Sequence, residues 1–161
     1  MMTLYELREW FLSLKVGAIR PVEFRNSGNR CSTVLHREPP YGVELIVWQP
    51  GCVVPVHHHP NMESLVESVN GDGVLLLGET EEEAKKKLER ASFWPARKLR
   101  SKLVHIPAGA WHGGKTGDTG MIFYSFQKWS GQVEQSVAGQ DWKGPALPTP
   151  NVSRFSHETA S

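Results

Sequence analysis

The sequence predicts one all-β domain, an antiparallel sandwich or barrel, with a helix in front of it and a second helix inserted into it. After Pro21, short runs rich in Val, Ile, Thr and aromatic residues alternate with Gly, Pro and Asn. Two other segments carry helix signals instead. The 161 residues, 39% of them hydrophobic, suffice for a single core, so we assign residues 1–135 to one domain.

The first residues of the chain have the pattern of an amphipathic helix. Thr3 and Glu6 have the spacing of a capping box. Apolar residues then recur at helical intervals, at Leu4, Leu7, Phe11 and Leu14. This pattern predicts a helix over about residues 4–14.

The strands are predicted from short apolar runs bounded by turn residues. These runs are CSTVLH, GVELIVW, CVVPVHHH, GVLLLG, KLVHIP and MIFYSFQKW. Their number and spacing are typical of an antiparallel sandwich or barrel.

One segment between the runs, residues 80–91, predicts a short surface helix. Its sequence, TEEEAKKKLERA, has a capping box, acidic residues in its first turn and Glu–Lys pairs four residues apart. Ala84, Leu88 and Ala91 form a narrow apolar stripe, so we expect this helix to lie across the barrel as an insertion.

The last residues, 136–161, are rich in Gly, Pro and Ser and hold few large apolar residues. This composition predicts an extended or partly disordered arm.

Charge and cysteine content argue against several classes of protein. With 18 basic and 17 acidic side chains, the net charge of +1 gives no field that favours nucleic acid or an anionic membrane. Two cysteines are too few for a secreted disulfide scaffold, and we expect both to be reduced. Charged residues interrupt the first apolar segment, so it does not resemble a signal peptide. We expect a cytoplasmic protein that binds a small molecule.

Four side chains are candidate metal ligands. His57 and His59 are two residues apart in a predicted strand, so both face one side while His58 faces the other. Glu63 follows after a turn, and His112 comes from a distant segment. Three imidazoles and one carboxylate suit Fe(II), Mn(II), Co(II), Ni(II) or Zn(II) better than Ca(II) or Mg(II).

The spacing of these residues resembles the two motifs of the cupin superfamily. The first motif, G-x5-H-x-H-x3,4-E-x6-G, is similar to Gly51-x5-His57-x-His59-x3-Glu63, and the second is similar to Pro107-x-Gly109-x2-His112. The resemblance implies a double-stranded β-helix, or jelly-roll barrel, with its core at about residues 40–130. It also implies one divalent metal ion per chain and a homodimer.

Further residues are candidates for the pocket around the ion. Trp48 could form part of its wall, and His105 could approach it. In the run MIFYSFQKW, one face carries Phe123, Ser125 and Gln127. The sequence leaves open whether this face lines the barrel.

The predicted site favours an enzyme over a binding module. Open positions on the ion would accept a small polar molecule with oxygen donors, alone or together with dioxygen. Iron is our first choice, which implies a dioxygenase, with Glu63 as a further candidate to accept a proton. Manganese, nickel, zinc or cobalt would instead suit an isomerase, lyase or decarboxylase. A barrel that binds a metal or small ligand without turnover is the other alternative.

Overall fold

The computed structural model describes residues 1–91 and 103–130, so the predicted arm at 136–161 lies outside the described residues. In chain order, the elements are α1 (Leu4–Ser13), the 3-10 turn η1 (Val16–Ala18), β1 (Glu23–Asn26), β2 (Arg30–Glu38), β3 (Tyr41–Trp48), β4 (Val53–His57), β5 (Met62–Gly78), α2 (Glu81–Arg90), β6 (Leu103–Ile106) and β7 (Trp111–Trp129). None of the helices in these residues is long and apolar enough to cross a membrane.

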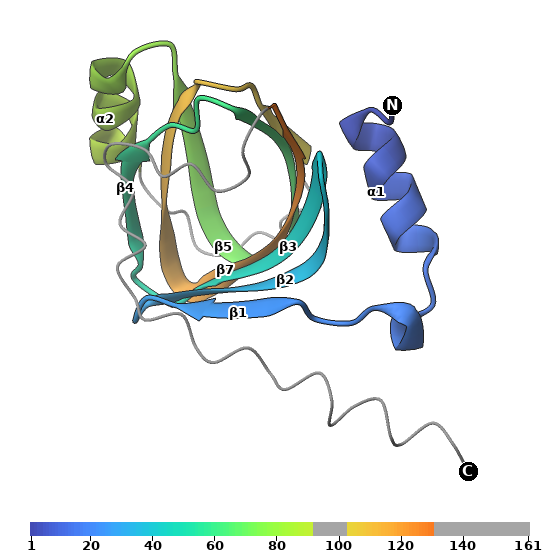
Figure 1. Ribbon diagram of the computed structural model, residues 1–161. Coiled ribbons are helices and arrows are strands. Elements are labelled where there is room, and N and C mark those ends of the chain that lie inside the picture. Colours follow the sequence, from blue (N-terminus) through green and yellow to red (C-terminus); the bar gives the residue numbers. More distant parts are fainter. Residues whose placement is uncertain (92–102, 131–161) are drawn as a thin grey trace.

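The strands form one antiparallel sheet that folds back on itself to make a barrel (Figure 1). The strand order is β1-β2-β3-β7-β5-β6, and β4 pairs with β7 as well. The end of β7 lies between β3 and residues 62–71 of β5, whereas its beginning lies between β4 and residues 73–78 of β5. The two halves of each long strand therefore belong to two facing layers. The predicted all-β fold is confirmed.

The bend between the layers lies where two glycines meet. Gly71 of β5 and Gly120 of β7 have φ angles of 98° and 68°, which side chains other than glycine rarely adopt. A Cβ atom at Gly71 would overlap the carbonyl oxygen of Gly120. The pairing of β5 with β7 also shifts register on both sides of this point. Glycine at position 71 is therefore required for both strands to turn together.

The barrel interior contains one hydrophobic cluster. Its buried members are Ile46, Trp48, Cys52, Val54, Val66, Ile106, Met121 and Phe123. The rings of Trp48 and Phe123 meet edge to face, with their centroids 4.9 Å apart. This cluster identifies the inward face of β3, β4, β5, β6 and β7.

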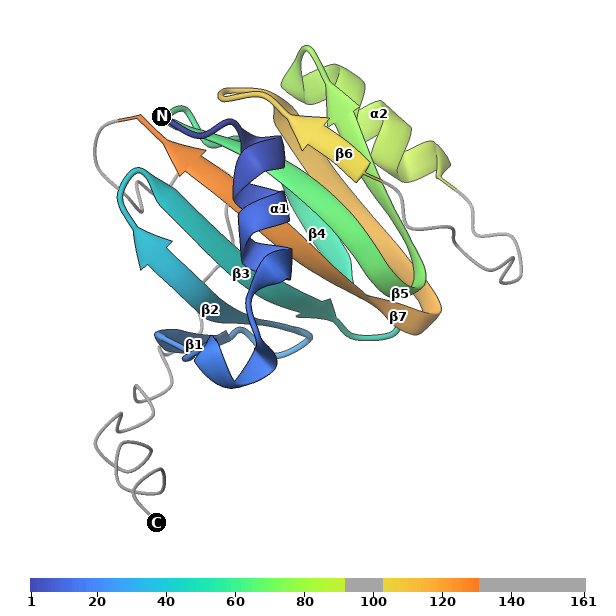
Figure 2. The same cartoon turned by 90° about the vertical axis from the view of Figure 1, so that its right-hand side faces the viewer.

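α1 covers the outer face of the sheet (Figure 2). Its capping box forms as predicted, because the Thr3 hydroxyl accepts a hydrogen bond from the Glu6 amide and the Glu6 carboxylate accepts one from the Thr3 amide. Three buried residues of α1 pack on three buried residues of the sheet and form a second hydrophobic cluster. Its members are Leu4, Leu7 and Phe11 of α1 and Val43, Leu65 and Phe126 of the sheet. Arg8 adds two hydrogen bonds to the carboxylate of Glu67 in β5.

α2 is the predicted inserted helix, and it lies against β4, β5 and β7 on the other layer (Figure 1). Thr80 caps it, and three Glu–Lys pairs four residues apart follow its exposed side. Ala84 is fully buried, and a Cβ atom at Gly78 would lie 2.6 Å from its amide nitrogen. The small residues at 78 and 84 let helix and strand approach closely.

Candidate metal centre

Two neighbouring strands and one loop bring three histidines together. His57 is the last residue of β4 and is paired in register with His112, the second residue of β7. β4 ends before His59, which therefore lies in the loop and not in the predicted strand. The amide of Gly109 donates a hydrogen bond of 2.7 Å to the carbonyl oxygen of His59 and so ties this loop to the β6–β7 connection.

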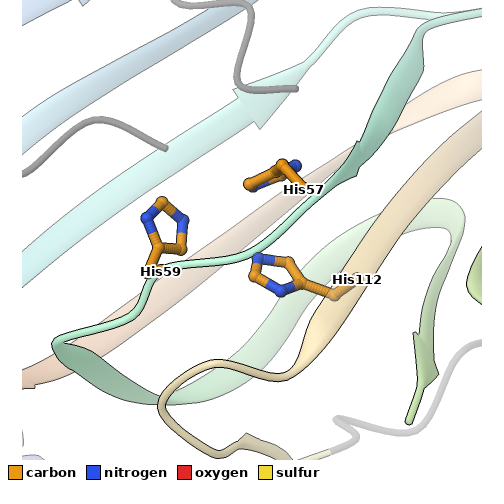
Figure 3. A group of neighbouring side chains, drawn as sticks. All are labelled: His57, His59 and His112. Atoms are coloured by element: carbon orange, nitrogen blue, oxygen red, sulfur yellow. The ribbon is translucent and has the colours of Figure 1, made fainter. Parts of the chain in front are cut away.

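The three imidazoles converge on one point (Figure 3). The candidate ligand atoms of His57, His59 and His112 all lie within 4.8 Å of one another. The ring centroids of His57 and His112 are 4.3 Å apart. The ring centroid of His59 lies 5.1 Å from that of His57 and 5.3 Å from that of His112. His57 and His112 are buried, while His59 is partly exposed. This arrangement could hold one metal ion.

Backbone contacts orient two of the rings for metal binding. Nδ1 of His57 lies 2.8 Å from the carbonyl oxygen of Pro55, and Nδ1 of His112 lies 2.8 Å from that of Ala110. Because a carbonyl oxygen only accepts, each Nδ1 donates its proton there. Nε2 of both rings then keeps a lone pair for an ion, an arrangement typical of metal-binding histidines. The residues present therefore fit a transition metal.

Burial keeps the cluster neutral. Loss of solvation lowers the pKa of His57. It also lowers the pKa of His112, to about 4, and the neighbouring His57 lowers the pKa of His112 further. The pKa of His59 falls to about 3, chiefly through burial and then through His57 and His112. All three rings are therefore unprotonated at neutral pH, which is the form that binds metal.

Glu63 does not join the three histidines. It alternates along β5 with Ser64, and it shares a face with Leu65, which packs under α1. Its carboxylate instead lies 3.3 Å from Nε2 of His105, and both side chains are partly exposed. The predicted set of three histidines and one glutamate is therefore corrected at Glu63, because strand alternation points this residue out of the barrel. His105 lies outside for the same reason.

The remaining pocket candidates face inward. Phe123 belongs to the interior cluster, so Ser125 and Gln127, two and four residues later, share its side of β7. Phe126 packs under α1 on the other side. The structure thus resolves the face left open by the sequence, and it places Trp48 inside as well.

Trp111 lies on the opposite side of β7 from His112. Its ring contacts that of His58, with the centroids 4.2 Å apart and the planes tilted by 44°. His58 thus faces away from the cluster, as strand alternation predicts.

The sequence analysis missed a group of charged residues on the inner face of β1, β2 and β3. Register places Arg30 beside Trp48, and Glu44 beside Ser125. Burial raises the pKa of Glu44, against the opposing effect of nearby arginines. The signal available in the sequence is the alternation of RCSTV and ELIVW, in which these charges share a face with apolar residues.

No protein-family model and no curated protein matches this chain. Several solved structures do resemble it. KdgF from a Halomonas species superposes with a TM-score of 0.50 at 11% identity, over 67% of this chain and 86% of that protein. An RmlC-like cupin from Shewanella frigidimarina gives a TM-score of 0.51 at 15% identity, over 69% of this chain and 86% of that one.

A third similar structure is the capsular polysaccharide assembling protein CapF from Staphylococcus aureus. Its TM-score is 0.54 at 18% identity, over 72% of this chain but 30% of that protein. At these identities, 11% to 18%, the similarity is one of fold.

Proposed function

Because the chain has the cupin fold, we propose that it is a metal-dependent enzyme acting on a small molecule with oxygen donors at the three-histidine site. The observation that carries this proposal is the convergence of His57, His59 and His112 within 4.8 Å. It is supported by the two backbone carbonyls that orient His57 and His112 and by the unprotonated state of all three rings.

The three imidazoles would leave several positions of an octahedral ion open to a ligand. When bound, Fe(II) would supply dioxygen chemistry, and Mn(II), Co(II), Ni(II) or Zn(II) would act as a Lewis acid. We place iron and a dioxygenase first, and a lyase, isomerase or decarboxylase second. Backbone carbonyls orient the rings of His57 and His112, and an apolar cluster fills part of the barrel interior.

The experiment that tests this proposal is elemental analysis of protein purified without chelator or added metal. Wild type is compared with His57→Ala and His112→Ala. The matched control is His58→Ala, because His58 contacts Trp111 away from the cluster. We expect about one ion per chain in wild type and in the control, and loss of the ion from the other two variants.

The identity of the ion separates the two reaction classes. Iron would direct a search for oxygen-dependent turnover, whereas manganese, cobalt, nickel or zinc would direct one for elimination or isomerisation. Wild-type protein that binds none of these ions, even after each is supplied, would refute the proposal. Equal metal content in His57→Ala and wild type would refute it as well.

A further inference from the structure

One end of the barrel holds two buried polar atoms that the proposed metal site does not use. Within the described part of the chain, Oε1 of Gln127 and Nε1 of Trp129 have no hydrogen-bond partner. Gln127 is 4% exposed. The amide oxygen only accepts a hydrogen bond, whereas the indole nitrogen only donates one. Buried atoms of this kind usually meet a ligand or an ordered water.

The two atoms come from neighbouring inward positions of β7. Trp129 follows Gln127 by two residues and therefore shares its side of the strand. Gly42 of β3 is paired in register with Gln127. All three residues lie near the start of β3 or the end of β7, far from the bend at Gly71 and Gly120. They are therefore close to one end of the barrel.

The absence of a side chain at Gly42 leaves both atoms near the same point. A Cβ atom at Gly42 would lie 3.1 Å from Oε1 of Gln127 and 3.7 Å from Nε1 of Trp129. The carbonyl oxygen of His36, 3.6 Å from the same point, is a further acceptor. One small polar group beside Gly42 can therefore reach both the donor and an acceptor.

Neighbouring residues hold the amide of Gln127 in this orientation. Its Nε2 donates to Oε2 of Glu44 and to Oγ of Ser125, each at 3.2 Å. Arg37 in turn lies 3.4 Å from the carboxylate of Glu44. Both amide hydrogens of Gln127 are thus in use, and its Oε1 is the atom that remains for a ligand.

The combination of one acceptor and one donor restricts the chemistry of that ligand. A carboxylate has no hydrogen to donate to Gln127, and an ammonium group has no lone pair to accept from Trp129. A hydroxyl group can do both. Met62 is buried, is paired with Trp129 and shares the inner face of β5 with Ser64. Together with the indole ring, it offers apolar surface to a carbon chain.

We propose that this end of the barrel binds a small uncharged alcohol. Its hydroxyl group donates to Oε1 of Gln127 and accepts from Nε1 of Trp129. The inference goes beyond the proposed function, because neither a metal ion nor the histidine cluster takes part in these contacts.

The test compares n-propanol, propionate and propylammonium, which share a carbon chain and differ in the polar group. Binding is followed by NMR on the indole N–H signal of Trp129, which is assigned by its absence from Trp129→Phe. The full-length protein is first freed of metal with a chelator, so that propionate has no ion to bind, and is then measured as purified. We expect n-propanol to bind with a dissociation constant at least about tenfold lower than that of either ion.

A substitution that fills the site tests its location. In Gly42→Ala the added methyl group lies against both polar atoms, so the affinity for n-propanol should fall by about tenfold or more. Gly17→Ala is the matched control, because nothing lies within 4 Å of a Cβ atom there. Neither glycine has a positive φ, so the backbone accepts alanine at both positions.

Circular dichroism and the melting temperature verify that these variants fold. If Gly42→Ala does not fold, Trp129→Phe replaces it, because phenylalanine keeps an aromatic ring but lacks the donor. Binding is then followed on the NMR signals of n-propanol itself, and the same loss of affinity is expected.

Three results would overturn the inference. The first is a Trp129 signal that does not respond to n-propanol at about 100 mM, which would leave ordered water as the partner of both atoms. The second is an equal response to all three probes, which would indicate apolar binding without the two hydrogen bonds. The third is an unchanged response in Gly42→Ala. None of them changes the metal content of the histidine site, so failure of this inference is distinct from failure of the proposed function.

Discussion

Glu63 and Ser64 are neighbours in β5, but only Ser64 faces into the barrel, where it is 3% exposed. We therefore expect Glu63→Gln to retain the metal content of wild type, because its carboxylate contacts His105 on the outer surface. Elemental analysis of Glu63→Gln beside His57→Ala tests this expectation. Loss of the ion from both variants would show that Glu63 is a ligand after all.

Glu44 should make the stability of the barrel depend on pH. Burial raises its pKa in the folded state above its value in the unfolded chain, so the folded state holds the proton more tightly. Its contribution is then most favourable at acidic pH and is lost as pH rises through the folded pKa. Glutamine mimics the neutral form at every pH.

We accordingly expect Glu44→Gln to raise the melting temperature more at pH 8 than at pH 5. Thermal unfolding at the two pH values measures the difference. Glu9→Gln, on the exposed side of α1, is the control and should show no such difference. A lower melting temperature for Glu44→Gln at pH 8 would mean that the ion pair with Arg37 outweighs the cost of burial.

The three histidines could be predicted from their spacing, whereas the position of Glu63 could not. Motif spacing counts residues along the chain, but the direction of a side chain depends on where the strand begins, and β5 begins at Met62. The inward-facing Arg30 and Glu44 were missed because charged residues in a strand usually face solvent.

At the scale of the strands, the stability of the fold should be especially sensitive to substitution of Gly71 at the bend. Gly71→Ala should destabilise the protein more than Gly28→Ala. Both positions have positive φ, of 98° and 82°, but nothing lies within 4 Å of a Cβ atom at Gly28, whereas one at Gly71 meets Gly120. Gly28→Ala, the control, should lower the free energy of unfolding by about 1 kcal/mol. Chemical denaturation measures both, and equal losses would contradict the need for close approach.

The packing of α1 offers a second test. Leu7 is completely buried against the sheet, so Leu7→Ala should reduce the free energy of unfolding by about 2–5 kcal/mol. The control is Tyr5→Ala, because Tyr5 is 58% exposed. This substitution should change the free energy of unfolding little. Similar losses in urea unfolding would mean that this face of α1 does not anchor the helix.

Both helices could be predicted because their capping residues are local signals, and α1 begins at the predicted residue. The long strands could not. The run GVLLLG is the second half of β5, and MIFYSFQKW is the second half of a strand that begins at Trp111. What joins the halves is pairing between β5 and β7 around the bend, a contact that no local pattern contains.

The whole molecule has strand edges without a pairing partner within its described residues, at β1, β4 and β6. We propose that two chains pair to form a homodimer, since unpaired strand edges favour association. Light scattering after gel filtration should give twice the mass of the 18.0 kDa chain at micromolar concentration. The monomer mass throughout this range would exclude the dimer.

β7 is the last described strand to be synthesised, and it contacts β3, β4 and β5. A nascent chain that ends before Trp111 therefore has α1 and several hairpin partners but no barrel, and His57 and His59 have no third histidine. On the ribosome, the edge of β3 that pairs with β7 stays unpaired for more than 70 residues, because Trp48 pairs with Met121 and Tyr41 with Lys128. Folding is therefore governed by long-range pairing and should be slow. Metal binding at the proposed site would then be a late event, because His112 is supplied only by β7.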